Sequence, residues 1–338
     1  MITHTLDATV ADPSDLLLTE MTSAKPSHVR IEPDPERVDA NFDYQVDELI
    51  EIPAGSPASR VAKAITADLN PRLWAPKGLI DHGAEDGPHP PRLFLSGFDV
   101  NGGVPASFER QTEKVPTIRI RNGQMSRTRR LIVRGGGVEL INENTDPDDG
   151  MKGQSEHADH EFALSNCHDV GLLLGGSSSF RGMRLKATIH GASRPLVGEA
   201  SANLYGLRAH VVIGVDEARQ ANGFGAACIL SSIHNAEIDL LVENKLEAGS
   251  PALYLGEKRS SGRDVDGIPF DESTQRQGSV RLHTVHTVPT IALFEGSRVD
   301  LPWYRFTHGN PHNGNRRRAQ WHCADGQVFE HEGRSPGR

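Results

Sequence analysis

Short runs in which apolar and polar residues alternate recur along the chain from about residue 90 to residue 304. Alternation over four to eight residues is typical of a strand with one buried face. The first clear run, residues 117–121, is closed by Asn122 and Gly123, a pair that favours a tight turn. Further runs follow at 131–133, 138–141, 164–174, 280–282 and 291–293. The pattern predicts an all-β fold made of many short strands.

One of these runs occurs twice. Residues 164–174 read LSNCHDVGLLL and residues 230–240 read LSSIHNAEIDL, so that His168 and His234 stand at the same place in each copy. The runs 183–189 and 205–211 match at an offset of 22 residues, and three such offsets separate the first two copies. A strand pattern that recurs at fixed spacing indicates a solenoid whose units pack on their neighbours.

The length of this repeat selects among the repeat folds. Helical repeats need about 33 residues or more, and the consensus of leucine-rich repeats is missing. A β-sandwich also has many short strands, but it does not predict that a strand pattern recurs at a constant spacing. A coil of about 22 residues made of short strands and tight turns is one rung of a parallel β-helix, in which neighbouring rungs pair about 4.8 Å apart. We therefore expect a parallel β-helix solenoid with coils of about 22 residues.

The remaining segments suggest how this solenoid begins and ends. Residues 1–55 are acidic, and the run from Pro33 to Glu36 disfavours regular structure, so we expect an irregular arm. Ser56 and Pro57 form a helix start, and apolar residues follow at helical spacing, which predicts a short capping helix and a first strand within 56–90. The β-helix then spans 91–304, with a polar insertion at about 256–278, and 305–338 form a basic, histidine-rich irregular tail.

The runs at 117–123, 164–172 and 292–299 resemble rungs of the right-handed parallel β-helix, or pectate-lyase-like, superfamily, and the resemblance covers roughly residues 90–304. It implies a right-handed solenoid. It leaves the function open, because fold alone does not determine chemistry. The superfamily includes polysaccharide lyases and hydrolases, as well as virus tail spikes and fibres, which are typically homotrimers that bind or cleave surface glycans.

Composition and charge narrow the function classes. A net charge of -9 disfavours a nucleic-acid binder, which needs a positive face. The chain has no run of about 20 apolar residues that would span a membrane, and its first residues lack the features of a secretion signal. Its 3 cysteines cannot form a disulfide framework, and Cys167 falls at an inward strand position, which predicts a buried thiol.

The densest cluster of chemically active groups runs from residue 146 to residue 161, in a segment that we expect to be a loop. Cleavage of a sugar chain needs two carboxylates, one as proton donor and one as base or nucleophile. Asp, Pro and Gly are also turn formers, so a solvated turn is the alternative. We expect no cofactor, although a divalent cation at this loop stays open. The candidate catalytic residues, if the chain is an enzyme, are Asp146, Asp148, Asp149, His157, Asp159, His160 and Glu161.

Histidines and the C-terminal tail supply two further candidate surfaces. If the rungs keep one register, some histidines stack on an outer face that either binds glycans or is simply solvated. The expected members of this face are His168, His190, His210 and His234. In the tail, an arginine cluster and an apolar anchor are candidate assembly contacts with a neighbouring chain. These residues are Arg316, Arg317, Arg318 and Trp321.

These observations lead to an expected function and two alternatives. A secreted β-helix enzyme would carry an export signal, whereas a virion protein is released by lysis. The sequence therefore favours a structural or receptor-binding component of a virus particle, such as a tail fibre, spike or surface decoration. It would assemble as a homotrimer with other virion proteins and contact host surface polysaccharide. The alternatives are a lyase or glycoside hydrolase acting on an acidic glycan through residues 146–161, and an intracellular protein-binding scaffold.

Overall fold

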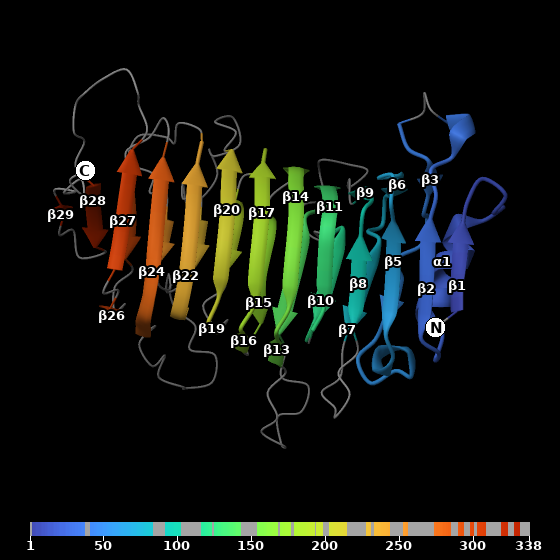
Figure 1. The fold of residues 1–338 in the computed structure, drawn as a ribbon, viewed down its shortest axis with the longest axis horizontal. Coiled ribbons are helices and arrows are strands. Elements are labelled where there is room, and N and C mark those ends of the chain that lie inside the picture. Colours follow the sequence, from blue (N-terminus) through green and yellow to red (C-terminus); the bar gives the residue numbers. More distant parts are fainter. Residues whose placement is uncertain are drawn as a thin grey trace, which may run out of the picture.

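The chain forms two long β-sheets that lie face to face, with sheet A in front in Figure 1 and sheet B behind it. Within the described residues sheet A is 18-stranded and sheet B is 11-stranded. The strand pairings among these residues are parallel, apart from an antiparallel pair at the end of sheet B. The computed structural model describes residues 2–37, 41–83, 92–102, 116–123, 125–142, 154–167, 170–176, 179–192, 194–198, 203–214, 228–230, 233–243, 253–255, 274–284, 290–293, 298–300, 303–308, 319–323 and 328–331.

Sheet A consists of β1 (Ile2–Leu6), β2 (Ser27–Ile31), β3 (Tyr44–Gln45), β5 (Lys63–Ala67), β6 (Arg72–Ala75), β8 (Leu93–Ser96), β9 (Asp99–Gly102), β11 (Arg127–Gly135), β13 (Gln154–Glu156), β14 (Asp159–Cys167), β16 (Ser179–Arg181), β17 (Arg184–His190), β19 (Asn203–Tyr205), β20 (Arg208–Gly214), β22 (Ile233–Val242), β24 (Thr274–Thr284), β26 (Arg298–Asp300) and β27 (Trp303–His308). Sheet B consists of β4 (Ile50–Ile52), β7 (Ile80–Gly83), β10 (Ile118–Arg121), β12 (Val138–Asn142), β15 (Val170–Gly176), β18 (Arg194–Gly198), β21 (Cys228–Leu230), β23 (Leu253–Leu255), β25 (Thr290–Leu293), β28 (Ala319–Cys323) and β29 (Val328–His331). The helices are α1 (Pro13–Thr22) and the 3-10 turns η1 (Pro35–Arg37) and η2 (Ala58–Arg60).

The chain passes back and forth between the two sheets. For example, β14 in sheet A is followed by β15 in sheet B, and the chain then returns to sheet A with β16 and β17. Each strand pairs with a strand of the next pass, which confirms the all-β class and the parallel arrangement. The length of a pass varies, however. Leu185 pairs with Ala209, 24 residues later, whereas Ala209 pairs with Ile238, 29 residues later. The still longer pass from Ile238 to Val280 spans the insertion expected at about 256–278. The described passes therefore vary in length, and a regular coil of about 22 residues is not confirmed.

The two copies that suggested this repeat cross between the sheets in opposite directions, the first from sheet A to sheet B and the second from sheet B to sheet A. Leu164 is in sheet A, where it pairs with Ile189, whereas Leu230 is in sheet B, where it pairs with Leu255. Alternation has a period of two in every half-buried strand, so unrelated strands of the same fold align well by sequence. His234 stands second in β22, opposite Tyr205. His168 lies outside the described residues, so the rung position expected to be shared by the two histidines stays a prediction.

The core consists of continuous columns of inward side chains, one from each pass. In sheet B a single column is buried over eight strands: Ile50, Ile80, Ile118, Val138, Leu172, Leu196, Cys228 and Leu253. A column of sheet A contains Val100, Val133, Leu164, Ile189, Ile213 and Val242. Columns of both sheets belong to one apolar cluster, because their inner faces pack on each other. Cys167 and Cys228 are both buried, as predicted for Cys167.

The N-terminal segment differs from the irregular arm expected for residues 1–55. It contributes β1, β2 and β3 to sheet A and β4 to sheet B. Its helix α1 begins after Asp12, whose side chain accepts the backbone N–H of Asp15 at 3.0 Å, and Pro13 stands in the first turn. The helix buries Leu17 and Met21 against the first strands of both sheets. It lies at the blue end of the molecule (Figure 1).

The helix expected from Ser56 onward is wrong. Only the turn η2 forms there, and β5 follows at once, paired with β2 on one side and β8 on the other. The apolar positions that fitted a helix also fit this strand, and two ladders of hydrogen bonds decide in its favour because local propensity is weaker than tertiary pairing. The terminal tail is also partly regular, since β28 and β29 form an antiparallel pair. Residues 256–273 of the expected insertion lie outside the described residues, and 274–278 belong to β24.

A buried lysine joins α1 to the sheets. Lys63 begins β5 and is 1% exposed. Its ammonium group donates to the backbone carbonyls of Glu20, Ser23 and Lys25 at 2.7–2.9 Å, and it lies 3.0 Å from the hydroxyl of Ser27. Burial lowers the pKa of Lys63 to about 8, so the group remains mostly protonated at neutral pH. The last turn of α1 has no basic residue of its own, and Lys63 supplies the positive charge that a helix C-terminus favours.

No helix among the described residues is long and apolar enough to cross a membrane.

Replacing Lys63 with Met should lower the free energy of unfolding by about 3 kcal/mol, because several buried carbonyls lose their donor together. Urea denaturation measures this change. Lys77→Met is the matched control, since Lys77 is an exposed lysine with one ion pair to Glu48, and it should change stability by less than about 0.5 kcal/mol. Equal effects of the two substitutions would show that Lys63 does not fasten the helix.

Candidate functional site

The outer face of sheet A carries rows of charged residues that run across successive strands. One row consists of Glu161, Lys186, His210 and Asp239 on β14, β17, β20 and β22. Within it, Lys186 donates to Glu161 at 2.8 Å, and His210 lies 3.2 Å from Asp239. Outward positions of adjacent parallel strands lie about 4.8 Å apart, which brings these groups into contact. The charges of Lys186 and Glu161 on neighbouring strands therefore neutralise each other.

A second row lies two residues earlier along the same strands. Asp159, Arg184, Arg208 and Glu237 follow one another in register. Asp159 accepts a hydrogen bond from Arg129 at 2.6 Å, and Arg208 lies 3.7 Å from Glu237. Each exposed pair contributes at most about 1 kcal/mol to stability. The rows therefore matter more as a polar surface than as a source of stability.

Two shallow hollows open on this face. The first encloses about 330 Å³, and its lining residues are Asp68, Asn70, Gly97, Arg130, Leu131, Ile132, Glu161, Phe162, Ala163, Lys186 and Thr188. The second encloses about 410 Å³ and is lined by Asp159, Arg184, Leu185, Lys186, Arg208, Ala209, His210, Glu237, Ile238 and Asp239. Because Lys186 lines both, the hollows form one surface that spans several neighbouring strands.

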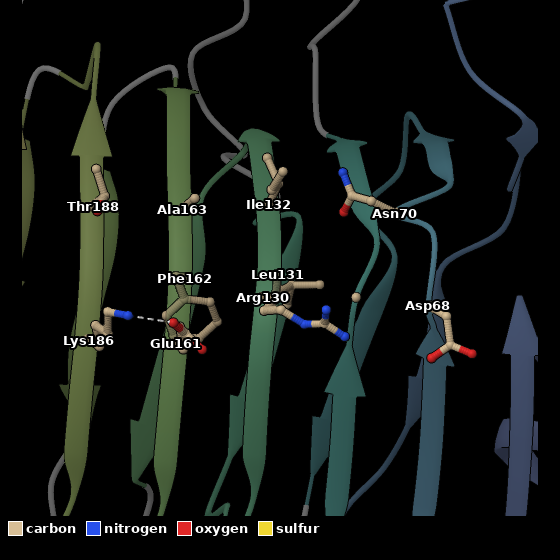
Figure 2. Close-up of a pocket in the computed structure, with 11 residues that line it drawn as sticks. Asp68, Asn70, Arg130, Leu131, Ile132, Glu161, Phe162, Ala163, Lys186 and Thr188 are labelled. Carbon is tan, nitrogen blue, oxygen red and sulfur yellow. Dashed lines mark hydrogen bonds and ion pairs between the residues drawn. The ribbon is translucent and has the colours of Figure 1, made fainter. Parts of the chain in front are cut away.

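The first hollow lies where the ladder of sheet A is interrupted. β11 pairs with β8 through Arg127–Arg129 and with β9 from Ile132 onward, and the turn at Gly97 separates these two partners. Towards β14 the register shifts between Thr128 and Leu131, so β11 has one residue more than its partner. Arg130 lies in this bulge with a φ of 47°. Figure 2 shows its side chain reaching from β11 across the hollow towards the neighbouring strands.

Among the expected catalytic residues that the structure describes, only Glu161 lines this first hollow. The hydrogen bond from Lys186 holds the pKa of its carboxyl below the usual range, and the backbone N–H of Arg130 and the charge of Arg129 act in the same direction against the opposing effect of burial. Glu161 is therefore ionised at neutral pH. It is an ion-pair partner and a hydrogen-bond acceptor, and it is not suited to donate a proton.

The expected loop 146–161 is wrong in its second half. Residues 154–156 form β13, and β14 starts at Asp159. This placement brings Asp159 and Glu161 together on the outer face, since they lie two residues apart on one strand. Asp146, Asp148 and Asp149 lie outside the described residues.

His160 belongs to the core and has no access to a substrate. Its position continues an inward column of sheet A, between Thr128 and Leu185, and it is 2% exposed. Its ring stacks on Phe162 and lies 3.3–3.4 Å from the hydroxyls of Thr128 and Ser126. Burial lowers its pKa to about 3, so the ring is neutral. The catalytic prediction for His160 is therefore wrong, because strand alternation directs it inward.

His157 is a corner residue. It joins β13 to β14 with a φ of 54°, and the next corners, Gly182 and Gly206, have a φ of 64° and 63°. A Cβ on Gly182 would lie 3.3 Å from the ring of His157, which places these two corners in contact. The left-handed region is open to glycine and tolerated by Asn, Asp and His. The residue type at 157 is thus explained by backbone conformation, and the catalytic role expected for it stays a prediction.

The expected histidine face is only partly assembled. His190 and His210 both lie exposed on the outer face of sheet A, in different rows. His210 lines the second hollow, whereas His190 lies against the backbone of Gly214. His234 is in β22, and nothing is described of its side chain. A glycan-binding role of these histidines stays a prediction.

The tail residues expected to contact a neighbouring chain are mostly outside the described part of the structure. Arg316, Arg317 and Arg318 lie outside the described residues, and of Trp321 only the backbone is described, in β28 opposite Ile291 and Phe329. Among the residues that the structure describes, no group of three or more His, Cys, Asp or Glu side chains is arranged to hold a metal ion.

Sequence reasoning missed the residues that shape the first hollow. The spacing of apolar residues predicts that Asp68 and Asn70 lie at the end of a helix. No motif or periodicity in the sequence marks Arg130 as a binding residue. The pair Asn70-Pro71 is nevertheless a turn signal, and Asn70 does adopt a left-handed φ of 55°. The bulge at Arg130 depends on the strands on either side of β11, so a local pattern does not reveal it.

A second buried histidine, His82, has no hydrogen-bond partner at either ring nitrogen within the described structure. It stands on the inner face of β7, between Ile52 and Ile120 of the adjacent strands. Burial lowers its pKa to about 4, and the charges of Lys63 and Arg121 act in the same direction. An unpaired buried polar group costs about 1–3 kcal/mol.

Comparison with protein-family models, with curated proteins and with solved structures finds no significant match to this chain.

Acid should destabilise the fold through His82 and His160. Both have folded-state pKa values below the usual 6.5, so the unfolded chain binds protons first as the pH falls. Each histidine should lower the free energy of unfolding by roughly 1.4 kcal/mol per pH unit below pH 6.5, and neither should contribute above pH 7. Urea denaturation between pH 7 and pH 5 measures the slope.

The variant His82→Leu should remove about half of this slope and also stabilise the protein at pH 7, where it eliminates the unpaired nitrogens. The variant His160→Leu, at the other buried ring, should remove the other half of the slope. An unaltered slope in His82→Leu would contradict the assignment of His82 as a buried neutral ring.

The corner role of His157 predicts an unusual order of substitutions. His157→Gly should keep the free energy of unfolding within about 0.5 kcal/mol, whereas His157→Val should lower it by about 1–2 kcal/mol, because a β-branched side chain is strained at positive φ. His190→Val, on a regular strand, is the control and should have little effect. If both substitutions at 157 are neutral, the corner assignment is wrong.

Proposed function

We propose that this chain is a right-handed parallel β-helix that serves as a structural, receptor-binding component of a virus particle and contacts surface glycans with the outer face of sheet A. The observation that carries the proposal is the pair of adjoining hollows that share Lys186. The passes between two parallel sheets support the β-helix part of the proposal. The receptor-binding part rests on the shape and chemistry of the hollows.

The shape of this surface fits an extended polymer better than a small molecule. Sites for small molecules are usually enclosed and mostly apolar. Here the hollows are shallow, they follow one another along the sheet, and charged side chains from successive strands border them. A polysaccharide presents hydroxyl groups at a regular spacing, and carboxylates, ammonium and guanidinium groups in rows can hydrogen-bond to them.

A glycan lyase or hydrolase remains the second candidate, because Asp159 and Glu161 share one face next to basic residues. The pairing of both carboxylates argues against it. Asp159 is bound by Arg129 and Glu161 by Lys186, whereas a glycosidase needs one carboxyl group whose pKa is raised for proton donation. The residues Asp146, Asp148 and Asp149 stay part of this alternative.

Binding of the full chain to a panel of immobilised acidic and neutral bacterial polysaccharides tests the proposal. We expect binding to at least one of them, and Lys186→Glu should weaken it about tenfold or more, because this substitution reverses the charge that both hollows share. Lys77→Glu makes the same charge change on a lysine that lines neither hollow, and it should bind as the native chain does.

Two further readouts separate the candidates. Sedimentation equilibrium should give about three times the chain mass of 36.8 kDa, and the bound polysaccharide should keep its length. A chain that binds no polysaccharide would overturn the glycan-binding proposal. If the native chain shortens the polysaccharide and Asp149→Asn does not, the chain is a glycan lyase or hydrolase and the structural proposal is wrong.

A further inference from the structure

We propose that Arg130 forms a subsite for a carboxylate-bearing sugar, such as a uronic acid residue, in the first hollow of sheet A. The inference rests on the proposed glycan binding and deepens it, because it assigns an acidic sugar to a named position. It follows from the charge balance of the hollow, from the backbone that places Arg130 there, and from the side chains around it.

The charge balance leaves one cation uncompensated. Four charged residues line the hollow: Asp68, Arg130, Glu161 and Lys186. Asp68 accepts a hydrogen bond from Arg30 at 3.1 Å, and Glu161 accepts one from Lys186 at 2.8 Å. Within the part of the chain that the structure describes, the guanidinium of Arg130 makes no ion pair. The hollow therefore offers one unused group with several N–H donors.

An exposed arginine without a partner is common, but the backbone of Arg130 is not. Arg130 has a φ of 47°, a conformation that costs a residue with a Cβ roughly 1–2 kcal/mol. The strain is held by the strand ladders on both sides of β11. Bulges of this kind redirect a side chain and are common beside binding sites.

The bulge directs the guanidinium across the hollow. In Figure 2 the Arg130 side chain extends from β11 to the side of the hollow where Asp68 and Asn70 lie. Gly97 also lines the hollow. Glycine is required at this position, because a Cβ there would collide with the backbone of Ala67. The backbone of the bulge therefore starts the Arg130 side chain towards the open hollow.

The surroundings fit the remainder of a sugar acid. Beside Arg130, the hollow has a mildly apolar side formed by Ile132 and Ala163, and Asn70 and Thr188 add an amide and a hydroxyl. A sugar acid combines a carboxylate, a weakly apolar ring face and several hydroxyls. A guanidinium binds a carboxylate with two parallel hydrogen bonds, which is the strongest contact that this set offers.

The test compares Arg130→Asn with Arg127→Asn. Asn tolerates the left-handed region, so Arg130→Asn removes the charge without adding strain. Arg127 is an exposed arginine on the same strand that lines neither hollow, and its substitution makes the same change in charge. Thermal denaturation establishes that both variants fold as the native chain does.

The probes are glucuronate and its neutral counterpart glucose, followed by NMR of the arginine Nε–H groups in the full chain. Glucuronate should shift the Arg130 resonance and leave that of Arg127 unchanged, and glucose should shift neither. With an oligoglucuronate, Arg130→Asn should weaken binding about 10- to 100-fold and Arg127→Asn less than about twofold.

Each outcome separates this inference from the glycan-binding proposal. If glucuronate shifts both arginines equally or neither of them, the Arg130 subsite is wrong, whatever the polysaccharide panel shows. If the native chain binds polysaccharides and Arg130→Asn binds them unchanged, the subsite is wrong and the receptor proposal stands. If glucuronate shifts the Arg130 resonance selectively but no polysaccharide binds, the Arg130 subsite is supported and the proposed polysaccharide-binding function is wrong.

Discussion

The structure depends on parallel strands that stack in register from one pass of the chain to the next. Hydrogen bonds between neighbouring passes hold each strand at a fixed separation, so every inward position becomes part of a column that runs along the molecule. The column from Ile50 to Leu253 consists of aliphatic residues and one cysteine over eight strands of sheet B. A slip of one residue would expose all of the inward side chains of a strand, and this cost fixes the register.

Stacking of this kind leaves the first pass with an apolar end, and the N-terminal segment solves this problem. Helix α1 covers the first strands with Leu17 and Met21, while the ammonium group of Lys63 binds the carbonyls that the helix leaves at its end. A buried charge is tolerated there because it meets several acceptors at once. His82 shows the opposite situation, since its ring is buried between isoleucines with neither nitrogen paired.

The sequence predicted the class of fold better than its dimensions. Alternation identified strands such as Ile118–Arg121 and the inward position of Cys167. These predictions succeeded because burial alternates from one residue to the next within a single strand, so a short stretch of sequence contains the signal. The number of residues in each pass could not be predicted from the sequence. Passes of different length occur within one sheet. The matched runs cross between the sheets in opposite directions, since the run from 164 starts in sheet A and the run from 230 starts in sheet B. The helix at Pro13 had a start signal like that of Ser56-Pro57, but neighbouring strands decided which of the two became a helix.

The same reasoning explains which parts of the candidate site were foreseeable. Asp159 and Glu161 stood out as acids next to a strand, and their spacing puts them on the outer face, but His160 between them had to turn into the core. Their basic partners, Arg129 and Lys186, come from neighbouring passes and are invisible in a local pattern.

A regular solenoid face tends to pair its own charges, because each outward residue meets residues of similar position on the strands beside it. Regular stacking does not pair every charge, since Arg184 stands in register on β17 without an ion pair in the described structure. The bulge of β11 adds a different feature, because an extra residue enters one strand but not its partner, and this residue is Arg130. Sequence periodicity does not predict such an irregularity, because the irregularity depends on the strands beside β11.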